Sequence, residues 1–476
     1  MKLSHKKFSI FVLLSLGLWP SSFAQNAENK TLSLKEFYQI IANNHPIVKQ
    51  AKSLPEAAQQ ELRIARGGFD PKLNSSLTRK EYNGTSYYNL FDAHLKVPVW
   101  TGTDLKIGYE RNNGVYLSNQ YRTPADGLSY IGISVPVGQG LFIDERRSTL
   151  RQAQLFQQIA QADQVKTINK IMLSAAKDYW EWFTAQQTYN AWKDAEKLAD
   201  IRYKGVRERA AVGEIAAIDT VEAFIIWQER IIQRQQADVA LQNARLVVSN
   251  YLWNEENQPV EVQASLQPEA FAVQPLVTEE KLSHLKENAL ANHPELKKFE
   301  YKIQQLEIQR RLGREMLKPA LNVNYNLLSA TPTAGENFQQ AYYTNNYKVG
   351  IDFSFPLLLR KERGKLQLIK VKQTQTRWEQ SQTNREIMND IQAQYNDLQN
   401  LTTLLQMQQR ITQDYERLRN AELRKYEEGE SSLFLINSRE SKFLDAQVKM
   451  ASLQAKYRKA MAMLLWAAGQ NELEQQ

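Results

Sequence analysis

The sequence predicts a mixed α+β fold that is built twice, with strands leading into helices far longer than a compact domain can hold. Three observations support this prediction. Four landmarks recur in the same order, the hydrophobic period changes between them, and glycine and proline are sparse, at 19 and 14 of 476 residues. A repeated order of landmarks is the signature of internal duplication.

The landmarks divide the chain into two halves. In order they are Asn44-His45-Pro46 and Asn292-His293-Pro294, Ile133-Ser134-Val135-Pro136 and Phe353-Ser354-Phe355-Pro356, Gly213-Glu214 and Gly429-Glu430, and Leu252-Trp253 and Leu465-Trp466. Their offsets are 248, 220, 216 and 213 residues. Because the offset falls by 28 between the first two landmarks and then hardly changes, one half carries an insertion confined to its strand region.

The first 24 residues predict an exported protein. Lys2, Lys6 and Lys7 precede an apolar stretch, and Ser22-Phe23-Ala24 is a small-x-small cleavage site, as in a secretory signal. The apolar stretch of residues 8–19 is shorter than the ~20 residues that span a bilayer as a helix. Without the three lysines, the formal charge falls from +8 to +5.

Charge and cysteine content exclude several classes of partner and chemistry. The modest positive charge is spread along the chain, so we expect no nucleic-acid partner. The absence of cysteine excludes disulfides, thiolate metal sites and an acylated N-terminal cysteine. The solitary histidines and the lack of a phosphate loop or nucleophile motif predict no metal, no cofactor and no enzyme activity.

Period-2 alternation predicts strands over about 71–138 and 319–357. One example alternates Ile131, Ile133, Val135 and Val137 with small residues. A soluble sandwich and a water-filled membrane barrel both have one wet face, so alternation leaves both open. No apolar run after the signal is long enough for a spanning helix, so insertion into a membrane would require a closed barrel.

The 28-residue excess leaves room for an additional hairpin. It would run from Lys72 to Tyr82, turn at Asn83-Gly84, and return from Tyr88 to Val99. The number of strands per chain is therefore open between four and six.

Helical spacing follows the strands in both halves. In the second half Ile391, Leu398 and Leu405 lie seven residues apart, which predicts a coiled-coil-like seam. Residues 141–212 and 359–428 would form helices of ~108 Å and ~105 Å at ~1.5 Å per residue. The predicted organisation is a signal at 1–24, a first repeat at 25–253 with a helical hairpin over 141–253, and a linker at 254–280. A second repeat at 281–468, with a hairpin over 359–467, precedes a tail at 469–476.

Several other residues have expected structural roles. His45 and His293 precede prolines at equivalent helix starts, and the tryptophans Trp180, Trp182, Trp192 and Trp227 are expected to pack. Arg146, Arg147 and Arg151 follow the strands and are expected to form a solvated basic collar.

Each long helix meets a glycine, Gly213 or Gly429, and a second helical pattern starts within a few residues. Glycine accepts the left-handed conformation that ends a helix. The two tips would lie at the free end of an elongated molecule.

The segment from Ala211 to Asp219, with an apolar residue before Gly213 and Asp six residues after it, resembles the tip pattern of the TolC-like outer-membrane efflux family. With the ordered landmarks, the resemblance covers nearly the whole mature chain. It implies a homotrimeric outer-membrane β-barrel continuous with a long α-helical coiled-coil periplasmic tunnel. The function implied is a passive exit duct of a tripartite efflux or type I secretion system.

The implied partners are other copies of the chain, outer-membrane lipid, a periplasmic adaptor and an inner-membrane pump. The residues expected to dock the adaptor are Gly213, Glu214, Gly429, Glu430 and Ser432. The cargo stays open among drugs, metals, peptides and proteins. An alternative function is a pore-free periplasmic or surface coiled-coil scaffold or adhesin.

In some members of the family, acidic residues six and nine positions after the second-tip glycine form the gate. Here these positions are Leu435 and Ser438. Our hypothesis is a constriction ringed by Asp219, with Glu430 nearby and apolar Leu435, because a ring of like charges favours cations and is relieved by protonation. The alternative is that these carboxylates are ordinary helix-start residues favoured by the helix dipole.

Overall fold

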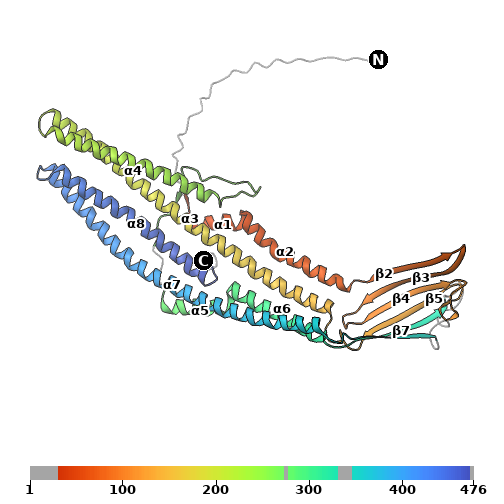
Figure 1. Cartoon of the computed structure of the whole chain (residues 1–476). Helices are drawn as coiled ribbons and strands as arrows, with labels where there is room; N and C mark the ends of the chain where they lie inside the picture. The colour runs from red at the N-terminus through yellow and green to blue at the C-terminus, as the bar shows by residue number, and fades with distance from the viewer. Residues whose placement is uncertain (1–29, 273–276, 331–345, 472–476) are drawn as a thin grey trace, which may run out of the picture.

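The computed structural model describes residues 30–272, 277–330 and 346–471. A β-sheet lies at one end of the elongated molecule and two helical tips lie at the other, with the C-terminus near the middle (Figure 1). The predicted signal at 1–24 lies outside the described residues. Within them, none of the helices is both long and apolar enough to cross a membrane.

The described elements follow one another twice in a similar order. The first series is β1 (Thr31–Leu32), α1 (Leu34–Asn44), α2 (Pro46–Arg66), β2 (Lys72–Tyr82), β3 (Thr85–Pro98), β4 (Asp104–Asn113), β5 (Leu128–Pro136), α3 (Glu145–Ala211) and α4 (Ala217–Ser249). The second is β6 (Gln267–Pro268), α5 (Glu279–Asn292), α6 (Pro294–Glu315), β7 (Ala320–Ala330), β8 (Tyr347–Ser354), α7 (Arg360–Glu427) and α8 (Leu433–Ala467).

The two histidine-proline landmarks start equivalent helices. His45 and His293 are the N-caps of α2 and α6, and each Nδ1 accepts a hydrogen bond of 3.2 Å from the backbone N–H two residues later. The following prolines occupy the first helical turn, where a missing N–H costs nothing. The predicted structural role of both histidines is therefore confirmed.

The helices form a single curved layer that is four helices wide. Near the sheet the order across the layer is α2, α3, α6, α7, and toward the tips it is α4, α3, α8, α7. The helices α3 and α7 have 67 and 68 residues, which corresponds to about 100 Å each. These two helices therefore run the length of the layer, while the shorter helices fill the places beside them.

The sheet is antiparallel throughout, in the order β2-β3-β4-β5-β7-β8. The described residues therefore contribute six strands to it. The predicted additional hairpin is present, and its turn residues Asn83 and Gly84 both have positive φ, at 51° and 67°, as a two-residue hairpin turn requires. Its second strand starts at Thr85, three residues earlier than predicted.

The two faces of the sheet differ in polarity. Apolar residues that recur on one face are exposed in the single chain: Leu73, Leu77, Leu95, Leu105, Ile107, Ile131, Ile133, Val349, Ile351 and Phe353. The opposite face carries charged and amide side chains, including Asp92, Lys106 and Asn324. This pattern requires that lipid or another apolar surface cover one face while water meets the other.

The predicted basic collar after the strands is wrong for Arg147. Its side chain is 7% exposed, and its guanidinium binds the Asp144 carboxylate at 2.9 Å and the carbonyls of Gly140 and Leu141. Burial alone would raise the pKa of Asp144, but the hydrogen bonds from Arg147 outweigh it and lower that pKa. Arg147 therefore fastens the turn into α3 instead of facing solvent.

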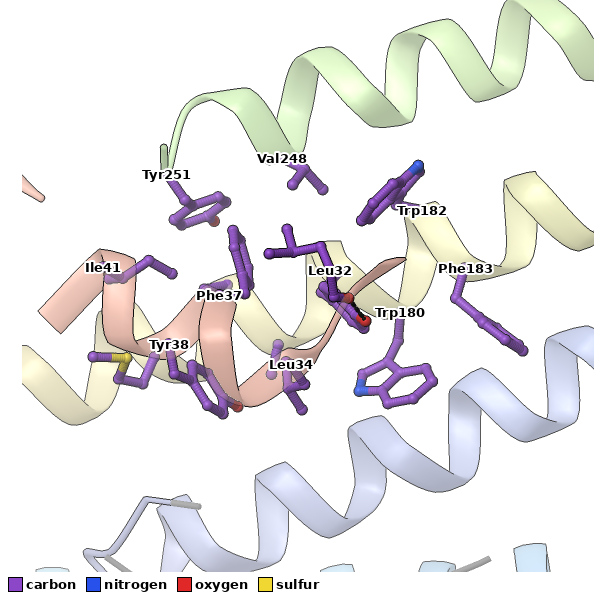
Figure 2. Packing of buried hydrophobic residues seen from close by; sticks show 14 of the residues in the cluster. Leu32, Leu34, Phe37, Tyr38, Ile41, Trp180, Trp182, Phe183, Val248 and Tyr251 are labelled. Carbon is purple, nitrogen blue, oxygen red and sulfur yellow. Dashed lines mark hydrogen bonds between the residues drawn. The ribbon is translucent and has the colours of Figure 1, made fainter. Parts of the chain in front are cut away.

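A large aromatic core lies where α1 meets the middle of α3 and the end of α4 (Figure 2). Trp180, Trp182 and Tyr179 are fully buried there, which confirms the predicted packing role of these two tryptophans. The Tyr179 hydroxyl donates to the Leu32 carbonyl at 2.6 Å and accepts from the Glu269 N–H at 2.9 Å. This hydroxyl ties α3 both to the start of the first repeat and to the segment that joins the repeats.

A second core follows the predicted seam of α7. Ile391, Leu398 and Leu405, seven residues apart, are buried against α8 and α5. Thus both repeats bury one side of their long helix in the middle of the molecule.

Candidate functional site: the paired helical tips

Both tips have the same backbone design. Gly213 and Gly429 adopt left-handed φ values of 77° and 80°. The N–H of the following residue, Glu214 or Glu430, donates to the carbonyl five residues earlier, at 3.0 Å and 2.8 Å. This 6→1 bond defines a Schellman motif, which satisfies the last carbonyls of a helix. A duplicated motif therefore ends α3 and α7.

The residues after the glycines differ between the tips. On the first tip, the Glu214 carboxylate pairs locally with Arg209 at 2.7 Å. On the second, Ser432 is the N-cap of α8, and its hydroxyl accepts from the Leu435 N–H at 3.3 Å. Glu430 and Ser432 are exposed. Both tips thus present exposed backbone and short polar side chains at the end of the molecule.

The candidate constriction residues are accessible but not joined to one another. Asp219 lies in the first turn of α4 and is half-buried, whereas Glu430, Leu435 and Ser438 are exposed on the second tip. Among the described residues, no hydrogen bond or ion pair connects Asp219 with the second tip. A ring made of these residues would therefore require several copies of the chain.

The two tips of one chain are fastened together by an apolar cluster. Leu433 and Ile436, from the first turn of α8, pack against Val206 of α3 and Ala223 of α4. These four side chains are between 1% and 5% exposed, so the contact excludes water.

A polar network continues this contact toward the middle of the layer. The Arg202 guanidinium of α3 donates to both oxygens of the Glu440 carboxylate of α8, at 2.7 Å and 3.3 Å, and to Asn437 at 3.1 Å. Asn437 in turn donates to Glu222 of α4 at 3.3 Å. The Glu440 side chain is 4% exposed and that of Arg202 is 16% exposed.

Arg230 of α4 forms the next contact between the hairpins. It donates to the Ser441 hydroxyl of α8 at 2.7 Å and lies over the Trp192 ring, 5.4 Å from its centroid. Burial lowers the pKa of Arg230. Sequence reasoning missed these arginines because each partner lies more than 200 residues away along the chain.

Comparison with known proteins identifies the second half directly. Residues 285–470 match the family model described as outer membrane efflux protein. The second repeat of the chain is therefore similar to this family. The resemblance expected from the tip pattern and the landmarks is confirmed. No curated protein matches the sequence.

Solved structures share the fold over nearly the whole chain. The CmeC outer membrane channel of Campylobacter jejuni matches with a TM-score of 0.65 and 15% identity, covering 93% of this chain and 86% of that one. The open state of the MtrE outer membrane channel of Neisseria gonorrhoeae has a TM-score of 0.66 and 13% identity, covering 92% and 89%.

The outer membrane protein VceC of Vibrio cholerae matches with a TM-score of 0.63 and 12% identity, covering 92% of this chain and 96% of that one. At these identities the likeness shows the fold. The fold is that of outer-membrane channels whose strands continue into a helical tunnel.

Proposed function

We propose that this protein is the outer-membrane channel of a tripartite efflux or type I secretion system. The observation that supports this most is the family match combined with the layout of the chain. A sheet with one apolar face lies at one end, and two exposed helical tips lie about 100 Å of helix away. The sheet would lie in the outer membrane of a Gram-negative-type cell, and the helices would extend into the periplasm.

The functional unit in this proposal is a homotrimer. Six strands are too few to enclose an aqueous lumen, because barrels with water-filled channels need roughly 12 or more. The helical layer is also open along both sides, at α2 and α4 and at α7. Three copies around one axis would close both the sheet and the layer.

The tips are the proposed docking site for a periplasmic adaptor. Gly213, Glu214, Gly429, Glu430 and Ser432 lie at the free end, exposed and held by two equivalent Schellman motifs. The adaptor would link the duct to an inner-membrane pump, which supplies the energy. The protein itself would act as a passive conduit without catalysis.

The constriction hypothesis remains part of this proposal. Asp219 from three chains would form a like-charge ring, with Glu430 nearby and with Leu435 and Ser438 lining the same end. Such a ring attracts cations and is relieved by protonation. Conductance of purified trimers tests it: if Asp219→Asn leaves cation selectivity and closure unchanged, the Asp219 ring is wrong.

A direct experiment separates the channel from a pore-free scaffold. We expect the protein to require detergent for extraction and to migrate as a heat-labile trimer on gels. Recovery as a soluble periplasmic monomer would support the scaffold and contradict the channel.

A further inference from the structure

Among the strands that the structure describes, none pairs with the outer edge of β2 or of β8. Every residue of β2 is exposed in the single chain, and so is every residue of β8 except one. Rows of free N–H and C=O groups at a sheet edge readily pair with another strand. Within lipid such edges cannot stay open, since no water is present to satisfy them. Each edge therefore needs a strand from another copy.

Inside one chain, the sheet already passes from the first repeat to the second. This junction is the β5–β7 ladder, in which Pro136 lies opposite Asn322. The ladder continues beyond β5, because the Val137 N–H donates to the Leu321 carbonyl at 2.8 Å. Gln139 donates to the Pro319 carbonyl in the same way, also at 2.8 Å.

The internal duplication maps this junction onto the two free edges. The end of β5 corresponds to the end of β8 at an offset of 220 residues. The start of β7, Pro319-Ala320-Leu321-Asn322, corresponds to the start of β2, Pro71-Lys72-Leu73-Asn74, at an offset of 248. That is also the offset of the histidine-proline landmarks. The junction from the second repeat of one copy to the first repeat of the next is thus equivalent to β5–β7.

We infer that β8 of one copy pairs antiparallel with β2 of the next copy, in the register that places Ser354 opposite Ser76. Three copies then close a barrel of eighteen strands, six from each chain. The inference rests on the proposed trimeric channel. The direction is consistent, because neighbouring strands alternate across six strands and β8 therefore runs opposite to β2.

The side chains fit this register. Leu357, which is 89% exposed in the single chain, comes to lie opposite Leu73, which is 78% exposed. Phe353 and Leu77, each 67% exposed, also become partners. On the other face, Ser354 meets Ser76 and Asp352 meets Thr78. The pairing therefore covers the most exposed apolar residues of both edges and keeps polar residues together.

The larger number of strands in the first repeat then has a functional consequence. Four strands per chain would give a twelve-stranded barrel, and six give eighteen. Since barrel diameter grows roughly linearly with strand number, the lumen is about 1.5 times as wide. The two strands between β2 and β5, which have no counterpart in the second repeat, would set the width of the outer pore.

Disulfide crosslinking tests the register directly, because the chain has no cysteine of its own. In the equivalent internal ladder, Val137 and Leu321 form the hydrogen-bonded pair, so the neighbouring pairs are non-hydrogen-bonded, with Cα atoms about 4.5 Å apart. Disulfides span this separation. The variant Ser76→Cys/Ser354→Cys is therefore the test pair, in purified trimer that is mildly oxidised.

Only a bond between chains is possible for this pair. Within one chain, Ser76 and Ser354 lie on opposite edges of the six-stranded sheet, roughly 24 Å apart at about 4.8 Å per strand spacing. We expect most chains to migrate as covalent dimers and trimers in denaturing gels, and reduction to return them to monomers. The variant Ser134→Cys/Asn324→Cys, at the equivalent internal pair, is the positive control for the geometry.

A slipped pair, Ser76→Cys/Gly350→Cys, is the matched negative control and should give little crosslinking. One outcome contradicts the register alone: the internal control oxidises and the trimer conducts, but the test pair stays monomeric in denaturing gels or the slipped pair crosslinks better. The register and the eighteen-stranded barrel are then wrong, while the proposed channel function stands. If the wild-type protein is monomeric and conducts no ions, the proposed function and the inference both fail.

Discussion

The Arg202–Glu440 pair should hold the two hairpins of one chain together near the tips. The variant Glu440→Ala removes the carboxylate and leaves the Arg202 guanidinium buried with only Asn437 as its described partner. Removing one partner of a buried ion pair costs about 3 kcal/mol or more. Both side chains are well under a third exposed, so solvent screens this pair little.

The assay is hydrogen–deuterium exchange of amides in residues 196–208 and 434–446. A loss of about 3 kcal/mol corresponds to roughly 100-fold faster exchange through local opening. The matched control is Asp200→Ala, which removes the half-buried partner of the exposed Lys204 on the same helix. That pair contributes only about 0.3–0.5 kcal/mol to stability, so the amide exchange rate should change by little more than twofold.

A double variant separates the ion pair from general packing. In Arg202→Met/Glu440→Met both charges are absent, and a buried pair replaced by apolar side chains is often as stable as the original. Exchange in the double variant should therefore return most of the way to the wild-type rate. Equal exchange in Glu440→Ala and Asp200→Ala would refute the reasoning.

Three further predictions follow from the described contacts. Trp182→Ala should lower the free energy of unfolding by about 3–5 kcal/mol because the ring is fully buried. Trp182→Phe should lower it less, since the indole N–H has no hydrogen-bond partner among the described residues. Thermal melting compares the two variants. Gly213→Ala should speed amide exchange at the first tip by an amount equivalent to roughly 1–2 kcal/mol. The reason is the left-handed backbone, because φ of Gly213 is 77° while the space for a methyl group is open. An unchanged exchange rate would contradict a left-handed turn. Burial lowers the pKa of His293, so the folded state disfavours the protonated imidazole. The free energy of unfolding should therefore fall as the pH drops from about 6.5 toward that lowered pKa. Thermal melting at two pH values should show this loss, and the loss should be smaller in His293→Asn.

Periodicity and turn residues predicted the elements of this fold because both depend on residues close together in sequence. The Asn83-Gly84 dipeptide between alternating segments predicted a hairpin that the structure contains. The seven-residue spacing of Ile391, Leu398 and Leu405 predicted a buried seam for the same reason.

Contacts between distant segments could not be predicted in this way. Arg202 and Glu440 lie 238 residues apart, on helices whose surfaces are rich in charge, so nothing local marks them as partners. Arg147 was wrongly expected to be solvated because a run of arginines after a strand is typical of an exposed surface. Its burial depends on the Gly140 and Leu141 carbonyls that the turn brings over it.

Several copies of this chain should together form an open duct through the outer membrane. Single-channel recording of the purified protein in planar lipid bilayers tests it most directly. We expect stepwise, long-lived conductance from a detergent-extracted trimer. A folded protein that inserts without conductance, or that stays monomeric and soluble without detergent, would contradict it.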